Sequence, residues 1–440
     1  MMELKGKRVM VVGLGVSGRA AARFLAAREA RLVLVDRAVV SLPSDFSTAD
    51  VHFGEEDPRW LDGVDLLVAS PGVARDSVLM REASRRGIAA IGEVELASRF
   101  ITAPIVGVTG TNGKSTVTMM VGDMLKRAGR NVFVGGNLGT PVVDAVGRGF
   151  DAIVAELSSF QLETIDRFRA HVAVHLNLTD DHFERYRDLE DYGRAKARIL
   201  ENQTADDWAI LNRDDPNVWK LQPDIKARVI SFGFSSTARD ALSPALNAVD
   251  FVIGDRRGRI DLARYRLPGR HNLANAMAAA AAALAMNVDA AAIEDALANF
   301  RALPHRIEFV RAWRGAKFFD DSKGTNVGAV VEALSAFDPP VILIAGGLDK
   351  GGDYEPLRRA IRNKARLAIL FGAARNKMRD ALAGAAEIEV VETLSAAVNR
   401  AAAGVREGDT VLLSPACSSF DQFKNYAARG EKFKGLVRAL

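Results

Sequence analysis

The sequence has very little cysteine and no long apolar run. Its 440 residues include one cysteine, Cys417, so no disulfide can form within the chain, and this favours a reducing compartment. The apolar run near the N-terminus, Val9–Val12, is too short for the hydrophobic core of a signal peptide. The uncharged stretch Leu273–Val288 is mostly alanine with two asparagines, and it predicts a buried helix rather than a membrane span. We therefore expect a cytoplasmic protein without membrane insertion.

An excess of one charge is also missing. The chain has 59 Lys and Arg against 55 Asp and Glu, a net charge of +4, and its basic residues are scattered. The sequence has no long basic block of the kind that would indicate a nucleic-acid partner. The small excess of positive charge suits at most small anionic substrates. With 48% hydrophobic and 26% charged residues, the composition is that of a soluble globular protein and not of collagen, a coiled coil or a disordered chain.

Strand-like apolar runs alternate with helical patterns along the whole chain. This alternation predicts an α/β fold with mostly parallel sheets, and the pattern restarts twice to give three blocks. The strand-like runs are Val9–Val12, Arg31–Val35, Leu66–Ala69, Pro104–Val108, Ala152–Ala155, Val172–Leu176, Lys317–Phe319, Val341–Ala345, Leu367–Phe371, Ile388–Val391 and Thr410–Leu413.

A glycine-rich loop with a lysine carries the strongest functional signal. The segment Gly-Val-Thr-Gly-Thr-Asn-Gly-Lys-Ser-Thr, residues 107–116, follows a strand-like run and precedes a helical pattern. Val108 stands where the standard Walker A spacing has a glycine, yet the loop still offers close backbone amides, a lysine and hydroxyls to phosphates and Mg²⁺. The candidate phosphate-binding residues are Gly110, Thr111, Asn112, Gly113, Lys114, Ser115 and Thr116.

A second glycine-rich turn, Gly13-Leu-Gly-Val-Ser-Gly18, follows the first strand-like run and is expected to precede a helix at Arg19–Arg28. Asp36 lies about twenty residues further on, as in the dinucleotide-binding fingerprint. Backbone amides of such a turn hold any pyrophosphate, so the motif does not choose the nucleotide. An NAD site, a site for another nucleotide and a simple packing turn all stay open at this point.

Three polar residues of the second block are further candidates. Glu156 ends a strand-like run, where a Mg²⁺ ligand is expected beside a phosphate loop. His182 follows the next run, in the segment Asn177–His182, and we expect it at the same sheet edge as a ligand. Lys196, within Ala-Lys-Ala-Arg, has the local pattern of an ordinary lysine on a helix surface.

Three polar clusters follow strand-like runs of the third block: Asp320–Asn326, Gly346–Lys350 and Ser414–Tyr426. Carboxyl ends of neighbouring parallel strands meet at one sheet edge, so the clusters predict a single binding crevice. Cys417 has no histidine nearby in the sequence, and we expect a buried packing cysteine rather than a nucleophile.

Taken together, these segments resemble the Mur ligase family of ATP-dependent amide-bond ligases. The resemblance covers essentially the whole chain and rests on the Gly-Thr-Asn-Gly-Lys-Ser-Thr loop, Glu156-Leu-Ser-Ser, Asn177–His182, Lys196, His271-Asn-x-x-Asn275, His305-Arg306 and Asp321-Ser-Lys-x-Thr-Asn326. It implies a Rossmann-like domain at 1–92 that holds UDP, and this makes the hypothesis of an NAD site much weaker. It also implies a central P-loop ATPase-type domain at 93–302, with a parallel or mixed sheet, and a C-terminal Rossmann-like domain at 303–440 that binds an amino acid.

Within the family, the segment Ser-Pro-Ala-Cys-Ser-Ser-Phe-Asp-Gln-Phe, residues 414–423, resembles the ending of members that add D-glutamate. The Asp-Asn-Pro-Arg motif of diaminopimelate-adding members is absent from the sequence. The resemblance implies ligation of D-glutamate to UDP-N-acetylmuramoyl-L-alanine through an acyl phosphate, in peptidoglycan precursor synthesis. A Mur-type ligase for another amino acid and a P-loop nucleotide-binding regulator are the alternatives.

The same resemblance implies a role for each site residue. Catalysis is assigned to Lys114, His182 and Lys196. ATP binding adds to the loop the residues Asn272, Asn275, Arg306 and Asp321. Two Mg²⁺ ions are assigned to Ser115, Glu156, His182 and Lys196, the last as a carbamylated lysine. The UDP substrate is assigned to Gly15, Val16, Ser17, Asp36, Arg37, Ser70, Gly72, Asn137 and Ser158. D-Glutamate is assigned to Thr325, Lys350, Ser419, Phe420 and Tyr426. A monomer that acts on small molecules, with no nucleic-acid partner, is expected.

Overall fold

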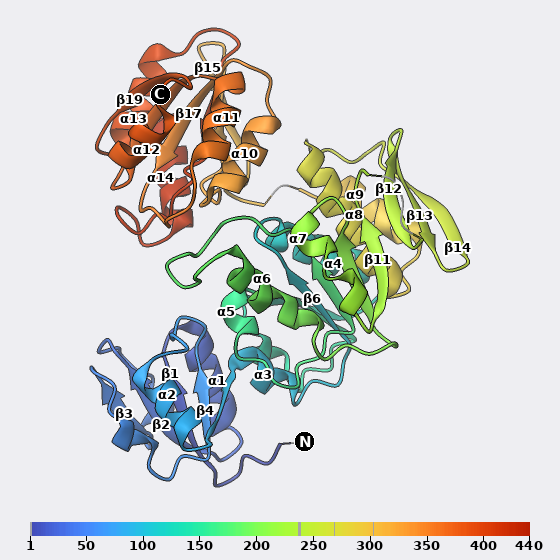
Figure 1. Cartoon of the computed structure of the whole chain (residues 1–440), viewed down its shortest axis with the longest axis vertical. Coiled ribbons are helices and arrows are strands. Elements are labelled where there is room, and N and C mark those ends of the chain that lie inside the picture. Colours follow the sequence, from blue (N-terminus) through green and yellow to red (C-terminus); the bar gives the residue numbers. More distant parts are fainter. Residues whose placement is uncertain (1, 236–238, 268, 302) are drawn as a thin grey trace. The chain divides into compact units, whose positions relative to one another are not determined.

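The computed structural model describes residues 2–235, 239–267, 269–301 and 303–440, and their strands form three sheets (Figure 1). This is the α/β architecture with parallel and mixed sheets that the sequence predicts. By internal contacts the chain divides into two compact units, which are described separately below. The first unit is Met1–Asn177, Tyr192–Arg264 and Asn275–Ala298, and the second is Leu178–Asp191, Tyr265–Ala274 and Asn299–Leu440.

The first sheet is parallel, with strand order β3-β2-β1-β4-β5. Its strands are β1 (Arg8–Val12), β2 (Arg31–Asp36), β3 (Asp50–Phe53), β4 (Leu66–Ala69) and β5 (Ala89–Gly92). Its helices are α1 (Val16–Ala26), α2 (Val78–Arg85) and α3 (Glu93–Ser98). The strand order reverses between β1 and β4, which creates a switch point at their carboxyl ends. Helix α1 begins at Val16, inside the expected turn, because only Gly13–Gly15 are needed to reverse the chain.

The central sheet is mixed, with order β14-β13-β12-β11-β10-β9-β6-β8-β7. Its strands are β6 (Ile105–Thr109), β7 (Val132–Gly136), β8 (Ala152–Glu156), β9 (Val172–His175), β10 (Trp208–Asn212), β11 (Arg228–Phe232), β12 (Ala241–Ala245), β13 (Ala248–Ile253) and β14 (Arg256–Asp261). Its helices are α4 (Lys114–Arg127), α5 (Ser159–Leu162), α6 (Leu189–Ala197), α7 (Pro216–Trp219), α8 (Arg270–Ala285) and α9 (Ala290–Asn299). The antiparallel strands β12–β14 are an addition that the sequence patterns do not predict.

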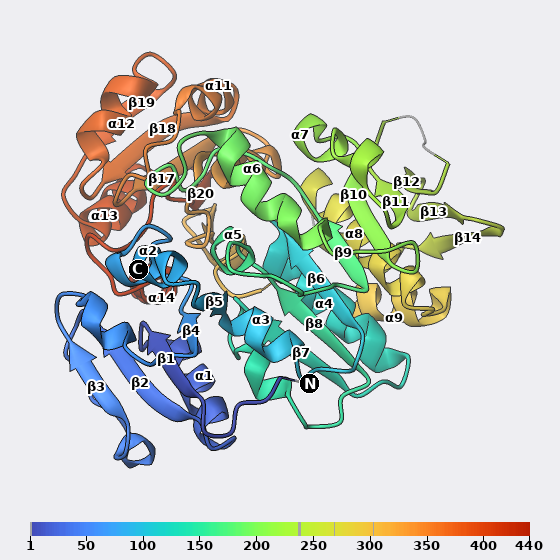
Figure 2. The same ribbon diagram turned by 60° about the horizontal axis from the view of Figure 1, so that its bottom comes forward.

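The third sheet has the order β15-β16-β20-β17-β18-β19, with only the β15–β16 pair antiparallel. Its strands are β15 (Glu308–Trp313), β16 (Ala316–Asp320), β17 (Val341–Gly346), β18 (Ala365–Phe371), β19 (Glu387–Val390) and β20 (Thr410–Leu413). Its helices are α10 (Val327–Ser335), α11 (Glu355–Lys364), α12 (Arg375–Leu382), α13 (Leu394–Gly404) and α14 (Tyr426–Arg438). Helices α11, α12 and α13 all pack on β18 (Figure 2).

Alternate residues of the third sheet face two separate hydrophobic cores. Leu343 of β17 packs in the core that α10, α11 and α12 cover, whereas its neighbour Ile344 packs in the core that α13 and α14 cover. Successive side chains of a strand point to opposite faces, so a sheet covered on both sides reads as a continuous apolar run. This is why β17, β18 and β20 are visible in the sequence, whereas the edge strand β15, which has no fully buried residue, was not predicted.

The alanine-rich stretch forms helix α8, as predicted. Residues 276–283 are all buried, and apart from Met277 they are alanines, whose small side chains allow close packing of the helix. Within the described ranges of the chain, no helix is long and apolar enough to cross a membrane.

Candidate active site

The loop between β6 and α4 is shaped for close approach of an anion. Gly110 and Gly113 have φ values of +146° and +86°, which favour glycine. A Cβ at Gly113 would lie 2.5 Å from Oδ1 of Asn275, and one at Gly110 would lie 2.9 Å from Cβ of Leu176. The predicted nucleotide residue Asn275 thus lies against the loop, and neither glycine can carry a side chain without movement of its surroundings.

Asn177 fastens this loop from the neighbouring chain segment. The amide of Thr111 donates to the carbonyl oxygen of Asn177 at 2.9 Å, and the amide of Asn112 donates to its Oδ1 at 2.8 Å. In return, Nδ2 of Asn177 donates to the carbonyl oxygen of Asn112 at 3.0 Å. Asn177 stood in the motif that ends at His182, but nothing in the sequence indicated this holding role.

The N-terminus of α4 meets the same loop. The helix begins at Lys114, directly after a glycine that has no side chain to cap it. Its positive dipole end therefore favours an anionic ligand. Nζ of Lys114 donates to the carbonyl oxygens of Gly110 at 2.9 Å and Thr111 at 2.8 Å, so the lysine folds back over the loop. Ser115 and Thr116 are buried in the first turn.

Three predicted residues meet at the carboxyl ends of β7 and β8. Glu156 is buried, and its Oε1 accepts a hydrogen bond of 2.8 Å from Nδ2 of Asn137. The amide of Asn137 also donates to the carbonyl oxygen of Glu156 at 2.8 Å. Ser158 caps α5 in a reciprocal arrangement with Gln161. Strand β8 is hydrogen-bonded to β6, so the carboxylate lies beside the strand that carries the phosphate loop, a place that suits Mg²⁺.

The expectation of a surface position for Lys196 is wrong. The side chain is 1% exposed, its Nζ donates to the carbonyl oxygen of Gly110 at 2.8 Å, and Nζ lies 4.5 Å from the ring centre of Tyr192. The helical segment that carries Lys196 runs over the sheet, because Ile199 just beyond it lies against Gly107 of β6. Packing of that segment onto the sheet, which the local pattern does not report, buries the lysine.

His175, at the end of β9, is a further titratable group beside this site. It pairs in register with Thr109, the last residue of β6 before the phosphate loop. The side chain is fully buried, and within the part of the chain that the structure describes neither ring nitrogen has a hydrogen-bond partner. Burial, and secondarily the charge of Lys196, lower the pKa of His175 to about 3. The ring is therefore neutral at physiological pH.

His182 belongs to the second compact unit, whereas the other predicted Mg²⁺ ligands belong to the first. Its backbone is left-handed, with φ of +59°, and its Nδ1 lies 2.9 Å from Oε1 of Glu184. The grouping of His182 with Lys196 around one ion stays a prediction.

Asp181 joins the segment before α6 to the third sheet's domain. Its buried carboxylate accepts a hydrogen bond from Nζ of Lys350 at 3.1 Å and another from Nδ2 of Asn326 at 3.1 Å. Burial raises the pKa of Asp181, but the charge of Lys350 and the other contacts outweigh it and hold the pKa below its usual value. Lys350, predicted for D-glutamate, therefore already binds a carboxylate.

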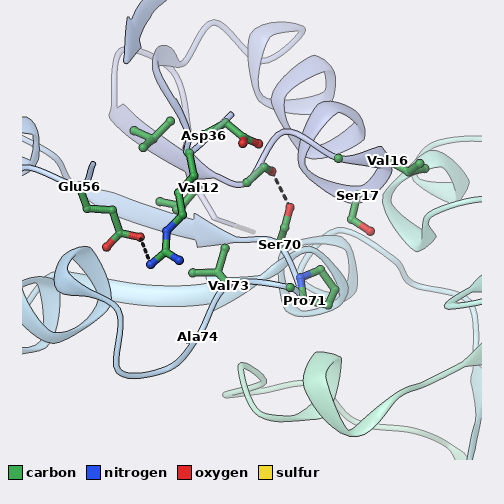
Figure 3. Close-up of a pocket in the computed structure, with 14 residues that line it drawn as sticks. Val12, Val16, Ser17, Asp36, Glu56, Ser70, Pro71, Val73 and Ala74 are labelled. Carbon is green, nitrogen blue, oxygen red and sulfur yellow. Dashed lines mark hydrogen bonds and ion pairs between the residues drawn. The ribbon is translucent and has the colours of Figure 1, made fainter. Parts of the chain in front are cut away.

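A pocket of about 510 Å³ lies at the switch point of the first sheet (Figure 3). It is lined by all seven residues of this domain that were assigned to UDP, namely Gly15, Val16, Ser17, Asp36, Arg37, Ser70 and Gly72. A Cβ at Gly18 would lie 1.8 Å from the carbonyl oxygen of Gly13, so the start of α1 packs tightly against the turn that follows β1.

Asp36 lines this pocket and accepts hydrogen bonds from two backbone amides. Its Oδ2 accepts from the amide of Leu14 at 2.6 Å, and its Oδ1 accepts from the amide of Ala38 at 2.9 Å. Across the pocket, the hydroxyl of Ser70 donates to the carbonyl oxygen of Gly13 at 2.6 Å (Figure 3). Glu56 also lines the pocket, and no motif indicated it.

The three polar clusters of the third block follow β16, β20 and β17, which are adjacent in the sheet, as predicted. Oδ2 of Asp321 accepts from the hydroxyl of Ser414 at 2.7 Å, and burial raises the pKa of Asp321 to about 7. Cys417 is buried, as expected, and burial raises its pKa to about 11, which disfavours the thiolate.

The remaining predicted residues of the second unit differ in their exposure to solvent. Ser419 is buried, whereas Phe420 is 69% exposed. Tyr426 begins α14, with its ring centre 5.5 Å from Nζ of Lys323. Asn272 is buried, and its carbonyl oxygen accepts from the hydroxyl of Tyr265 at 2.9 Å. Thr325 lies two residues before α10, and its amide donates to the carbonyl oxygen of residue 323 at 2.9 Å. Arg306 is half-buried.

Three family models match successive parts of the chain. They are the Mur ligase MurD-like N-terminal domain at residues 7–92, the Mur ligase middle domain at 108–283 and the Mur ligase glutamate ligase domain at 305–417. A UDP-N-acetylmuramoylalanine–D-glutamate ligase from Geotalea uraniireducens is 44% identical over 449 residues, covering 100% of this chain and 99% of that protein. The chain belongs to the Mur ligase family. A protein of the same name from Thermoanaerobacter pseudethanolicus is 41% identical over 452 residues, covering 100% of both chains.

Solved structures of Mur ligases share the fold. A pseudomurein peptide ligase of type C from Methanothermus fervidus superposes with a TM-score of 0.63 at 18% identity, covering 99% of this Mur ligase and 100% of that chain. A MurF ligase from Thermotoga maritima, solved in complex with ADP, superposes with a TM-score of 0.62 at 18% identity, covering 100% of both chains.

Proposed function

We propose that this Mur ligase joins D-glutamate to UDP-N-acetylmuramoyl-L-alanine, with conversion of ATP to ADP and phosphate, in peptidoglycan precursor synthesis. It is an ATP-dependent ligase, as its family membership indicates. The single observation that carries the choice of substrates is the similarity over the full length to ligases named for this reaction. The chemistry of the sites supports it, since a phosphate loop, a nucleotide pocket and a carboxylate-binding lysine occur in one chain.

In the proposed first step, a carboxylate oxygen of the acyl substrate attacks the γ-phosphorus of ATP, and the bond to ADP breaks. Two anions must approach each other, so positive charge between them lowers the barrier. Lys114 and the N-terminus of α4 supply such charge from the chain itself. In the second step, the amine of D-glutamate attacks the acyl carbon, phosphate leaves, and the nitrogen loses its proton.

The residues of the first unit fit Mg·ATP. The glycine cradle has no room for a Cβ, and the buried Glu156 offers a hard oxygen ligand beside the loop. We propose two Mg²⁺ ions, one near Ser115 and Glu156 and one near His182 and Lys196, which would neutralise phosphate charge. Lys196 would serve as a carbamate, because an ammonium repels a cation. The buried, unpartnered ring of His175 fits an added polar group in this place.

The second unit would receive D-glutamate. Lys350 donates to the carboxylate of Asp181, and this pairing with a carboxylate supports the assignment. We propose that this lysine binds a carboxylate of D-glutamate. Thr325, Ser419, Phe420 and Tyr426 would complete the D-glutamate site. The switch-point pocket of the first sheet would hold UDP, and the enzyme would act as a monomer in three domains, 1–92, 93–302 and 303–440.

A substrate screen tests the proposal directly. Phosphate release is measured with ATP, Mg²⁺ and UDP-N-acetylmuramoyl-L-alanine against a panel of D- and L-amino acids. We expect release that requires both the UDP-sugar acid and D-glutamate. Release with another amino acid would identify a different Mur-type ligase, and ATP hydrolysis without either substrate would indicate a nucleotide-binding regulator.

Lys114→Ala tests the phosphate loop. Loss of one group that stabilises transition-state charge lowers kcat by about 10²–10³. The matched control is Lys126→Ala, at the exposed end of the same helix, which should keep normal turnover. Near-normal turnover of Lys114→Ala at saturating ATP would refute the assignment.

Lys196→Ala tests the carbamate. The variant should fold yet be nearly inactive, and small carboxylic acids should restore part of its activity by occupying the vacated position. Lys220→Ala, at an exposed lysine of the same unit, is the control. An unmodified Lys196 in fully active enzyme, seen by intact mass with ¹³C-labelled CO₂ and by NMR, would contradict the proposal.

A further inference from the structure

Arg429 on α14 is the largest side chain among the described residues that is fully buried. Its guanidinium makes four hydrogen bonds of 3.2 Å or less, all to uncharged oxygens. Nε donates to the hydroxyl of Ser322 at 3.0 Å, and Nη2 donates to the Ser322 carbonyl at 2.9 Å. Nη1 donates to the carbonyls of Cys417 and Ser418, both at 3.2 Å. Across the described ranges, no carboxylate forms an ion pair with Arg429 within 4.0 Å.

These acceptors lie on loops that follow different strands of one sheet. Ser322 follows β16, and Cys417 and Ser418 follow β20. The loop after β17 also reaches the guanidinium, because a Cβ at Gly347 would lie 3.1 Å from Nη1 and 2.2 Å from the carbonyl oxygen of Ser418. One planar cation therefore ties the carboxyl ends of three adjacent strands, which the five fixed N–H donors of arginine make possible.

Each of the three loops carries a residue assigned to D-glutamate. Thr325 lies three residues after Ser322, Lys350 lies three residues after Gly347, and Ser419 directly follows Ser418. Displacement of any loop by a fraction of an ångström would move one of these contacts relative to the other two. The side chain that holds all three is buried beneath them and touches no solvent.

Burying a cation without a directly paired carboxylate costs free energy, because the charge loses its hydration. Well-packed apolar side chains of similar volume often stabilise a fold as well or better. Burial lowers the pKa of Arg429 to about 10, so the guanidinium is still charged at neutral pH. The negative charges of Asp421, Asp320 and Asp321 act on the guanidinium without forming a direct ion pair, and they oppose the lowering of its pKa by burial.

We propose that Arg429 is a positioning residue for the amino-acid substrate: its hydrogen bonds hold the three loops in the register that receives both carboxylates. This inference rests on the proposed function and deepens it. It makes the affinity for D-glutamate, rather than that for ATP, depend on a residue that touches neither.

The test compares Arg429→Met, which removes the charge and the donors, with Arg429→Lys, which keeps the charge alone. Ser322→Ala removes one acceptor and leaves the arginine in place. Lys434→Met is the matched control, since Lys434 is a buried cation of the same helix that binds Glu308 and Glu431 instead of the loops. For each variant, kcat, the KM for D-glutamate, the KM for ATP and the melting temperature are measured.

Loss of hydrogen bonds from a charged donor should raise the KM for D-glutamate of Arg429→Met about ten- to hundred-fold. Arg429→Lys and Ser322→Ala should show smaller rises, with the KM for ATP within about three-fold of wild type in every case. Lys434→Met should lower the melting temperature without changing the KM for D-glutamate. If Arg429→Met does not fold, Arg429→Lys and Ser322→Ala provide the same comparison.

Equal rises in both KM values, or a lower kcat and melting temperature with unchanged KM values, would overturn the positioning role. The wild-type enzyme is assayed first. Absence of D-glutamate-dependent phosphate release there would refute the proposed function and with it this inference. Normal wild-type turnover with an unchanged KM in Arg429→Met and Arg429→Lys would refute the inference alone.

Discussion

Replacement of His175 by leucine should make the central sheet more stable in mild acid. The imidazole is fully buried at the end of β9, and within the described residues both of its nitrogens lack a partner. Because burial lowers its pKa to about 3, the folded chain cannot take up a proton there at pH 5. The unfolded chain can, since a histidine in water has a pKa of about 6.5.

The unfolded state thus binds more protons than the folded state between pH 3 and pH 6.5, and stability through His175 falls as the pH falls. From the two pKa values, the wild-type protein loses about 2 kcal/mol of unfolding free energy through this residue between pH 7.5 and pH 5. His175→Leu has no such loss and also removes two unsatisfied buried nitrogens, so it should be at least as stable as wild type at pH 7.5.

Hydrogen exchange measured by mass spectrometry on peptides that cover β9 and β10 is the suitable assay. A chain of several domains does not unfold in one step, so a global midpoint would not report on this strand. The control His171→Asn changes a histidine just before β9 that is partly exposed and lies 3.2 Å from Asp207. It should not reproduce the gain at pH 5. An opening free energy that differs between His175→Leu and wild type by the same amount at pH 5 and pH 7.5 would refute the reasoning.

Two further substitutions, each with a control, test the nucleotide loop and the stability of the fold. Gly113→Ala should raise the KM for ATP at least about ten-fold, because its Cβ would lie 2.5 Å from an asparagine oxygen at the loop. Gly129→Ala has a similar positive φ but open space around it, so it should leave that KM unchanged, and equal effects of the two would contradict the cradle. Glu95→Ala should cost about 3–5 kcal/mol and lower the melting temperature, because one buried carboxylate oxygen accepts the three amides of residues 166–168. Glu29→Ala, at an exposed ion pair, is its control, and equal melting temperatures would show that the amides find other partners.

Several strands with continuous apolar runs were predicted, but an apolar run did not guarantee prediction, since β10 and β13 were missed despite their buried apolar residues. Strands β1, β4, β17 and β20 are buried on both faces, which leaves a continuous apolar run in the sequence. Strands β12–β14 were missed, because β12 contains Pro244 and β14 reads Arg-Arg-Gly-Arg-Ile-Asp with one buried residue. An edge ribbon of this kind is held by backbone pairing and carries little apolar signal.

The order of the motifs and much of their chemistry can be read along the chain. A glycine-rich loop after a strand, with a lysine at the start of the next helix, identifies a phosphate site wherever it occurs, because the necessary groups are neighbours in the sequence. The turn after β1 is also glycine-rich, but it has no such lysine, and its sequence alone left a simple packing turn open. These local patterns, with the family resemblance, were enough to predict the fold class and the ligase chemistry.

Burial and pairing between distant segments were decided only by the tertiary structure. Lys196 looks like a surface lysine in the sequence, but in the structure the segment around it packs against β6 through Ile199, and its ammonium donates to the carbonyl oxygen of Gly110. Nothing near Arg429 in the sequence indicates that it contacts a loop 107 residues upstream. The reason is physical: a side chain's neighbours within one turn or strand follow from local geometry, but its solvent exposure depends on which distant elements the hydrophobic core brings against it.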